Sequence, residues 1–213
     1  MSACPPPMSA EPALPRRAED QGALPDGEGW WEELNRLDLA VYVAVAATPS
    51  PQLDRVFRGL SRAADRSMLW ISTAAVLATV GGAGGRRAAV NGLASIGVTS
   101  VVVNLLVKPL ARRRRPERAT HRVPITRQVT MPRTTSFPSG HAASASAFAT
   151  GVATAWPEAG IPVSIAATLV AYSRVHTGVH YPVDVIAGVV TGEMLAQLTV
   201  AALERRRGRR PHD

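Results

Sequence analysis

The chain has 213 residues, enough for one domain with short extensions, and its apolar, alanine-rich and aromatic-poor composition favours helices over sheets. Its net charge of +8 suits an anionic partner such as nucleic acid, lipid headgroups or a phosphorylated substrate. The basic residues fall between long uncharged runs, which favours a membrane and argues against nucleic-acid binding. The single cysteine, Cys4, excludes an intrachain disulfide.

The first part of the chain is rich in proline, and we expect residues 1–33 to form a disordered arm. Two amphipathic stretches follow, one ending at Pro49 and one between Leu53 and Arg62. Each carries apolar residues on one face and polar residues on the other. They are typical of one or two helices that lie at a membrane surface.

Two uncharged runs come next, from Ser67 to Gly85 and from Ala88 to Val107, separated by Arg86 and Arg87. About 20 apolar residues cross a bilayer, so these runs predict a transmembrane hairpin. Three further apolar runs follow a polar, arginine-rich loop, at about 141–156, 161–172 and 185–203. A soluble bundle with buried apolar helices is the alternative, but the lengths of the runs favour the membrane.

The fold class that this pattern predicts is all-α: a multi-pass transmembrane helix bundle of about five spanning helices plus one or two N-terminal interfacial helices. The membrane domain would occupy residues 34–204, and a basic tail would occupy residues 205–213. Gly188 and Gly192 have the small-xxx-small spacing that allows membrane helices to approach closely, so we expect tight packing around them.

If the five runs alternate across a membrane, the segments 108–139 and 172–184 lie on the same side. Both segments carry side chains suited to phosphate chemistry. These are Lys108, Arg115, Ser139, Gly140, His141, Arg174, His180 and Asp184. His141 follows a Pro-Ser-Gly turn at the start of a helical run, and helix N-termini favour anions. Lys108 is the only lysine beside 23 arginines, which singles it out.

Three motifs in this region resemble the signature of the type 2 phosphatidic acid phosphatase superfamily. The first is Lys108, six residues, then Arg115-Pro116, and the second is Pro138-Ser139-Gly140-His141. The third is Ser173-Arg174, five residues, His180, three residues and Asp184. All three occur in order with the spacings of the family, and the resemblance covers about residues 39–203. Many membrane members have an additional spanning helix where this chain has its proline-rich arm.

The resemblance implies a metal-independent phosphatase that needs no cofactor and acts through a phosphohistidine. His180 would be the nucleophile, Asp184 would accept its other ring proton, and His141 would serve as acid and then as base. The phosphate-binding residues would be Lys108, Arg115, Ser139, Gly140 and Arg174, through side-chain donors and the glycine amide.

Several other polar residues have simpler interpretations. We expect Arg112, Arg113, Arg114 and Arg118 to form an interfacial basic cluster that contacts lipid headgroups. His176 lacks an acidic residue four positions later, so we expect a supporting or surface role for it. Glu193 lies inside the last apolar run, where a charge is costly, and we expect it to be protonated or paired within the bundle.

The expected partners are the membrane and a lipid phosphate substrate, with no nucleic acid. The resemblance suggests phosphatidate, phosphatidylglycerol phosphate, undecaprenyl diphosphate or a decaprenyl-phosphate sugar phosphate, and the motifs do not rank them. Oligomeric state is not indicated. Most of the 24 Lys and Arg residues lie on the side of the site, which favours a cytoplasmic site. Members of the family most often present the site to the extracytoplasmic side of the cell membrane, which is the orientation that we favour.

Three other functions fit less well. A vanadate-dependent haloperoxidase shares the oxyanion cradle, but such enzymes are usually much larger and soluble. A lipid-binding protein with a decayed site would lack at least one catalytic residue, and none is missing here. Nucleic-acid binding would leave the long uncharged runs unexplained.

Overall fold

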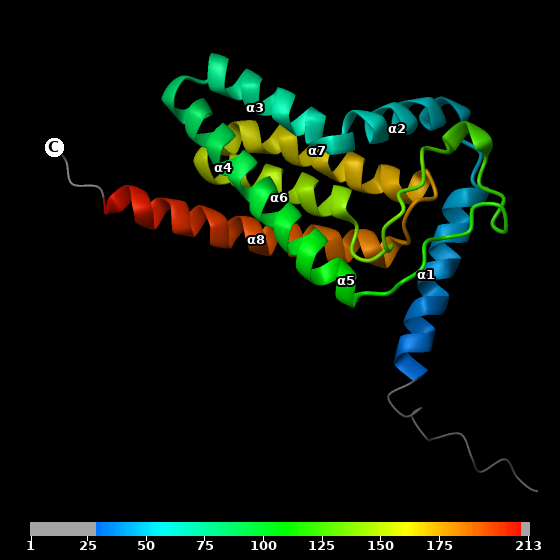
Figure 1. The fold of residues 1–213 in the computed structure, drawn as a ribbon. Helices are drawn as coiled ribbons and strands as arrows, with labels where there is room; N and C mark the ends of the chain where they lie inside the picture. The colour runs from blue at the N-terminus through cyan, green and yellow to red at the C-terminus, as the bar shows by residue number, and fades with distance from the viewer. Residues whose placement is uncertain (1–28, 210–213) are drawn as a thin grey trace, which may run out of the picture.

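The structure is a computed structural model that describes residues 29–209, and within that range every regular element is helical (Figure 1). The elements in chain order are α1 (Gly29–Ala47), α2 (Pro51–Ala63), η1 (Asp65–Ser67), α3 (Met68–Val80), α4 (Gly82–Val101), η2 (Val102–Val107), α5 (Lys108–Leu110), η3 (Ile125–Arg127), α6 (Gly140–Ala155), α7 (Pro157–His176) and α8 (Pro182–Gly208). The prediction of an all-α fold is confirmed.

The boundaries of the predicted segments differ from the helices in several places. Residues 29–33, which we expected in the arm, belong to α1, and residues 1–28 lie outside the described part of the chain. Arg86 and Arg87 do not separate two helices but lie within α4, because the chain turns earlier, at Gly81 and Gly82. Gly82 has a φ of +56°, a conformation that side chains disfavour and glycine adopts freely.

Helix α6 lies at the centre of a bundle formed with α4, α7 and α8, and α3 packs along the outside of α4 (Figure 1). The α3–α4 turn and the α6–α7 turn lie at one end of this bundle. The α2–α3 junction, the irregular segment 111–139 and the α7–α8 connection lie at the other. The alternation therefore brings the start of α6, the end of α4 and the start of α8 to one end, as the sequence predicted.

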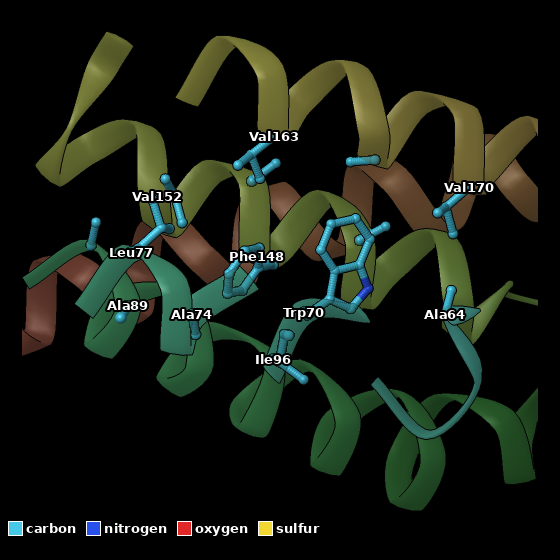
Figure 2. Close-up of a cluster of buried hydrophobic side chains, with 14 residues drawn as sticks. Ala64, Trp70, Ala74, Leu77, Ala89, Ile96, Phe148, Val152, Val163 and Val170 are labelled. Carbon is cyan, nitrogen blue, oxygen red and sulfur yellow. The ribbon is translucent and has the colours of Figure 1, made fainter. Parts of the chain in front are cut away.

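The core between α3, α4, α6 and α7 consists mainly of alanine and valine side chains around two aromatic rings (Figure 2). The rings of Trp70 and Phe148 lie 5.3 Å apart, between centroids, and both side chains are at most 2% exposed. Alanines fill much of the remaining interior, for example Ala88 and Ala145. This alanine content allows the helix backbones to lie close together.

Packing between α6 and α8 depends on the two glycines noted in the sequence. A Cβ atom at Gly188 would lie 2.5 Å from the carbonyl oxygen of Ser139, and one at Gly192 would meet the carbonyl oxygen of Ala143. Real Cβ contacts are not this short, so no larger residue fits without moving a helix. The prediction of close packing at Gly188 and Gly192 is confirmed.

Large apolar side chains lie mostly on the outside of the bundle, which is the reverse of a soluble core. Examples are Leu105, Ile161, Ile186 and Leu198, all more than 55% exposed. An exposed apolar surface on this scale is typical of contact with lipid. Two continuous helical segments, Gly82–Leu110 and Pro182–Gly208, are long and apolar enough to cross a membrane. The α3 helix has 13 residues and the α6 helix 16, so the count of five spans stays a prediction.

Candidate active site

Ser139, Gly140 and His141 begin α6 at the end of the bundle that carries the irregular segment (Figure 1). Ser139 is the N-cap, and its hydroxyl accepts a hydrogen bond from the amide of Ala142 at 3.5 Å. The amide of Ser139 donates to the carbonyl oxygen of Asp184 at 2.9 Å. This second hydrogen bond fixes the start of α6 beside the first turn of α8.

His180 lies in the short connection between α7 and α8 and is 2% exposed. The amides of Val179 and His180 donate to the carbonyl oxygen of Arg174 at 3.0 and 3.2 Å, so the chain turns back tightly after α7. The His180 ring then places Nε2 3.2 Å from Nη1 of Arg115. Because a guanidinium can only donate, Nε2 is assigned as the unprotonated nitrogen and Nδ1 carries the hydrogen.

The charge state of His180 follows from its surroundings. Burial lowers the pKa of His180 to about 4, and the positive charges of Arg115 and Arg174 lower it in the same direction, while Asp184 opposes them. The imidazole is therefore neutral near pH 7, with a free electron pair on Nε2.

Asp184 lies on the opposite side of the His180 ring, in the first turn of α8. Its Oδ2 atom is 3.7 Å from Nδ1 of His180, which is longer than a hydrogen bond. The hydroxyl of Ser136 lies between them: Oγ is 3.5 Å from Nδ1 and donates to Oδ2 of Asp184. The amide of Tyr181 also donates to Oδ2, at 3.0 Å. The predicted link between Asp184 and His180 therefore runs partly through Ser136, which the sequence analysis did not single out.

Three cationic side chains come to this end of the bundle from three segments. Arg115 is held by the carbonyl oxygens of Thr134 and Val179, at 2.8 and 3.1 Å. Arg174 is 1% exposed and donates to the hydroxyl of Ser61, while its Nε is buried without a hydrogen-bond partner among residues 29–209. The ammonium of Lys108 lies 3.3 Å from the point where a Cβ atom on Gly140 would stand. Gly140 therefore leaves the space that Lys108 needs beside the start of α6.

His141 has an acidic partner that the sequence did not indicate. Its Nε2 atom lies 2.9 Å from Oδ1 of Asp65, in the short turn η1 between α2 and α3. The Asp65 carboxylate favours the protonated imidazole, whereas burial and the positive charge of Arg174 outweigh it and favour the neutral form. No motif indicates Asp65; the sequence shows only that it lies between two predicted helices, at the end of the bundle where His141 also lies.

A pocket of about 350 Å³ opens beside these groups, and Lys108, Gly140 and His141 form part of its wall. His180 and Arg174 are almost completely buried and do not line this pocket. Within residues 29–209, no three His, Cys, Asp or Glu side chains gather closely enough to hold a metal ion.

The sequence from residue 88 to residue 208, more than half of the chain, matches the family model of the PAP2 superfamily. The chain belongs to the PAP2 superfamily. This is the type 2 phosphatidic acid phosphatase group that the three motifs resembled, so the prediction of the family is confirmed.

The chain is similar to curated and solved PAP2 phosphatases. It is 35% identical over 165 residues to a decaprenylphosphoryl-5-phosphoribose phosphatase of Mycobacterium tuberculosis, covering 76% of this chain and 88% of that protein. The crystal structure of Aquifex aeolicus LpxE matches with a TM-score of 0.65 and 21% identity, and the match covers 78% of this chain and 95% of that chain. The crystal structure of a transmembrane PAP2 type phosphatidylglycerolphosphate phosphatase from Bacillus subtilis matches with a TM-score of 0.61 and 23% identity. This match covers 81% of this chain and 87% of that chain. The prediction of a membrane phosphatase is confirmed.

The PAP2 site includes a buried ion-pair network that corrects our interpretation of Arg113. Its guanidinium does not face lipid headgroups but donates to Asp184 Oδ1 at 2.7 Å and to Asp38 of α1. Asp38 is 3% exposed and also accepts a hydrogen bond from the amide of Val183 at 2.8 Å. Helix α1 is therefore docked on the first turn of α8, and it supports Asp184 instead of only lying at the surface.

Of the other arginines in the predicted headgroup cluster, one is hydrogen-bonded inside the protein and two are exposed. Arg118 is not free for lipid either, because it donates to the carbonyl oxygens of Gly178 and Val129 at 3.3 and 2.7 Å. These bonds tie the irregular segment to the connection that carries His180. Arg112 and Arg114 are exposed, so they remain the members of the cluster that can meet headgroups.

His176 is part of a second buried network, which excludes the surface role that we considered and leaves a supporting one. Its Nε2 lies 3.0 Å from Oδ1 of Asp54, and Nε of Arg127 lies 2.7 Å from the same oxygen. Arg127 is 1% exposed and also donates to the carbonyl oxygen of Val45 at 2.9 Å. The network joins α1, α2, η3 and α7, so it fixes the irregular segment against the helices.

Glu193 is exposed on α8 and borders a small pocket lined by hydroxyl groups of α6 and α7. Within residues 29–209 it forms no ion pair, so of the two expected states, protonated or paired, the paired one is not observed and the protonated one stays a prediction.

Proposed function

We propose that this PAP2 protein removes the terminal phosphate of a lipid-linked substrate through a phosphohistidine formed on His180. The observation that carries the proposal is the neutral Nε2 atom of His180, 3.2 Å from Arg115, in a buried cationic setting. A phosphoryl group beside Nε2 would meet donors from Arg115 and Lys108. It would also give the buried Nε of Arg174 the acceptor that it lacks.

In the first step, the Nε2 electron pair of His180 attacks phosphorus, and the bond from phosphorus to the leaving oxygen breaks. His141, which acts in its protonated form and is hydrogen-bonded to Asp65, gives its proton to the leaving oxygen. The imidazole ring of His180 becomes positive as the N–P bond forms. Its Nδ1–H points to Ser136 and Asp184, whose negative charge stabilises the ring.

In the second step, water takes the place of the leaving group. His141, now neutral, accepts a proton from the water as its oxygen bonds to phosphorus, and the N–P bond breaks. The electron pair returns to Nε2 of His180 and inorganic phosphate leaves. His141 is again protonated and His180 again neutral, so the cycle closes without any other reactant.

The substrate is proposed to be a lipid phosphate or a prenyl diphosphate whose tail stays in the bilayer. We propose that α3, α4 with α5, α6, α7 and α8 span the cell membrane and that the site faces the extracytoplasmic side. The apolar outer surface of these helices supports this placement. Arg112 and Arg114, both exposed near the site, suit contact with lipid headgroups.

A decaprenyl-phosphate sugar phosphate is the second candidate substrate. The similarity to the mycobacterial decaprenylphosphoryl-5-phosphoribose phosphatase extends over 88% of that protein and supports it. Both candidates end in a phosphate that His180 can attack, so they differ only in the group that follows.

The mechanism is tested with the purified protein in detergent, with a chelator present, by measuring phosphate release from lipid phosphates and prenyl diphosphates. Wild type should release phosphate, and His180→Ala should not. A substrate with a radiolabelled terminal phosphate should leave an acid-labile, base-stable label on the wild-type protein. The label should accumulate in His141→Ala if that variant still accepts the phosphoryl group. Full activity of His180→Ala, or activity that disappears on chelation, contradicts the proposal.

Orientation is tested by cysteine accessibility in intact cells, after Cys4→Ser removes the native thiol. Arg133 is exposed in the irregular segment near the site, and Gly84 at the opposite end of the bundle has open space for a side chain. Arg133→Cys should react with a membrane-impermeant maleimide and Gly84→Cys should not. The reverse pattern would place the site in the cytoplasm.

A further inference from the structure

The pocket beside Lys108 and His141 extends along a wall of polar side chains that the reaction on phosphorus does not use. These are Ser67 from the α2–α3 junction, Ser100 and Asn104 from the helical segment Gly82–Leu110, and Ser144 from α6. Nearby outward positions of that same helix carry Leu105 and Leu106, as expected for lipid contact. The polar wall is therefore local to the pocket.

The hydroxyl groups on this wall are available for a ligand. Serine and threonine side chains in membrane helices commonly bond to a carbonyl oxygen of their own helix, and Ser95, Thr168 and Ser173 do so here. The hydroxyls of Ser67, Ser100 and Ser144 have no hydrogen-bond partner among residues 29–209. Asn104 uses one amide hydrogen on the carbonyl oxygen of Ser100, at 2.9 Å, and its side-chain oxygen remains free.

A cation on a strained turn completes the pocket. Arg66 lines it from η1, and both Arg66 and Ser67 adopt left-handed backbone conformations, with φ of 53° and 60°. Two successive non-glycine residues in this region cost energy, and such strain is concentrated at functional sites. The turn directs Arg66 and Ser67 to the pocket and places Asp65 on His141. Arg66 forms no ion pair within residues 29–209.

The chemistry of these walls matches one kind of group. Free hydroxyls and an amide recognise a ligand with several hydroxyl groups, whereas an acyl or prenyl chain would leave them unpaired at a cost. Lys108 and Arg66 provide cations on two different walls, which suits two anionic groups. The volume of about 350 Å³ lies at the small end of the range for ligand pockets, roughly 300–1,000 Å³.

We infer that the pocket binds a sugar located between two phosphates. The terminal phosphate would lie at Lys108 and His141, the sugar hydroxyls at Asn104 and the serines, and the phosphodiester that leads to the lipid at Arg66. The inference rests on the proposed function and narrows its substrate to a lipid-linked sugar phosphate. Asn104 and Arg66 are specificity residues in this assignment and take no part in bond breaking.

The test compares two substrates with the same short prenyl chain, a prenyl-phosphoryl pentose 5-phosphate and a prenyl diphosphate, on purified protein in detergent. Asn104→Leu should lower kcat/KM for the sugar phosphate about 10-fold, the loss expected for one or two hydrogen bonds. Arg66→Asn removes the charge but keeps a residue that tolerates the left-handed conformation, and should cost roughly 10–100-fold. Activity on the diphosphate should change by less than about 3-fold.

A matched control is Thr79→Val, which removes an exposed hydroxyl that bonds only within α3. It should leave both activities unchanged, and melting temperatures in detergent should show that all variants are folded. Equal losses on both substrates, or no loss on either, overturn the sugar assignment while the phosphatase mechanism stands. Absence of phosphate release by wild type from any lipid phosphate or diphosphate would instead reject the proposed function.

Discussion

Arg113 lies 2.7 Å from Asp184, and its other terminal nitrogen donates to Asp38 of α1. The guanidinium thus holds the carboxylate that faces His180 through Ser136. Arg113→Gln should lower kcat roughly 10–100-fold, the effect of losing one charge-assisted hydrogen bond, with little change in KM. Arg112→Gln is the control because Arg112 is exposed on the same segment. A variant that keeps full kcat, or that changes only KM, would show that Arg113 does not position Asp184.

Ser136 should influence the reaction through the tautomer of His180. Ser136→Ala removes the hydroxyl that lies between Nδ1 and Asp184, and a direct contact of 3.7 Å remains. We expect kcat to fall roughly 2–10-fold, the usual value for a neutral hydrogen bond. Ser144→Ala changes a serine one turn into α6 and should not affect kcat on prenyl diphosphate. Equal kcat values for wild type and Ser136→Ala would show that Asp184 alone, without Ser136, holds the Nδ1–H group of His180.

The pH profile of kcat/KM should reflect the pKa of His180. That pKa is lowered to about 4 by burial, with Arg115 and Arg174 acting in the same direction. His180, the proposed nucleophile, stays neutral down to this value, so its protonation should limit kcat/KM only as pH falls toward about 4. In Arg115→Gln the removal of a positive charge should raise the pKa and shift this acid limb to higher pH. An acid limb that does not move would contradict the contact between Arg115 and His180.

The same lowered pKa has a consequence for stability, with a definite sign. Between about pH 6.5 and pH 4 the unfolded chain binds a proton on His180 that the folded protein does not, so this residue makes the fold less stable as pH falls. His180→Gln should therefore lose part of the decrease in melting temperature over this interval. Melting curves in detergent at several pH values measure it, and identical slopes for both proteins would contradict a buried neutral His180.

The close approach of α6 and α8 should make Gly188 intolerant of any side chain. Gly188→Ala places a Cβ atom 2.5 Å from the carbonyl oxygen of Ser139, so the start of α6 must move. Overpacking of this kind costs about 1–3 kcal/mol, and activity should fall with it because Ser139 caps the helix that carries His141. Gly97→Ala is the control, since a Cβ atom there meets nothing within 4 Å. Equal melting temperatures for the two variants would contradict the packing described.

The network around Asp54 should matter for folding more than for chemistry. Arg127→Met leaves Asp54 buried beside His176 without its guanidinium, and breaking a buried pair in this way costs about 3–5 kcal/mol. Adding Asp54→Asn should recover part of the loss in melting temperature, because no buried charge then remains. A double variant that is no more stable than Arg127→Met would argue against this ion pair.

Sequence reasoning predicted the all-α fold and the approximate limits of most helices, and it named eight residues as a candidate site whose roles stay predictions. The fold and the family could be predicted because uncharged runs and fixed motif spacings are local features of the chain. The prediction that these residues lie at the same end of the bundle followed from the alternating directions of successive helices. The glycine pair at 188 and 192 was also readable, because close packing leaves a regular spacing of small residues.

The partners of these residues could not be predicted in the same way. Asp38, Asp65 and Asp54 pair with groups more than 70 positions away, and no periodicity connects such positions. Arginines 113 and 118 resembled a surface cluster because four basic residues in a loop have the same pattern whether they face lipid or a buried carboxylate. Three-dimensional placement decides between these cases, and it depends on how the irregular segment folds over the helices.

The docking of Asp38 against Val183 and Arg113 has a consequence for how the enzyme is made. Asp38 and Val183 are separated by 145 positions, so this contact forms only after the first turn of α8 has left the ribosome. Helices inserted earlier can pair with each other, but the carboxylate that faces His180 gains this support only when α8 is present. Nascent chains that stop before α8 should therefore be inserted yet inert, and lipid hydrolysis should begin only after α8 has been synthesised.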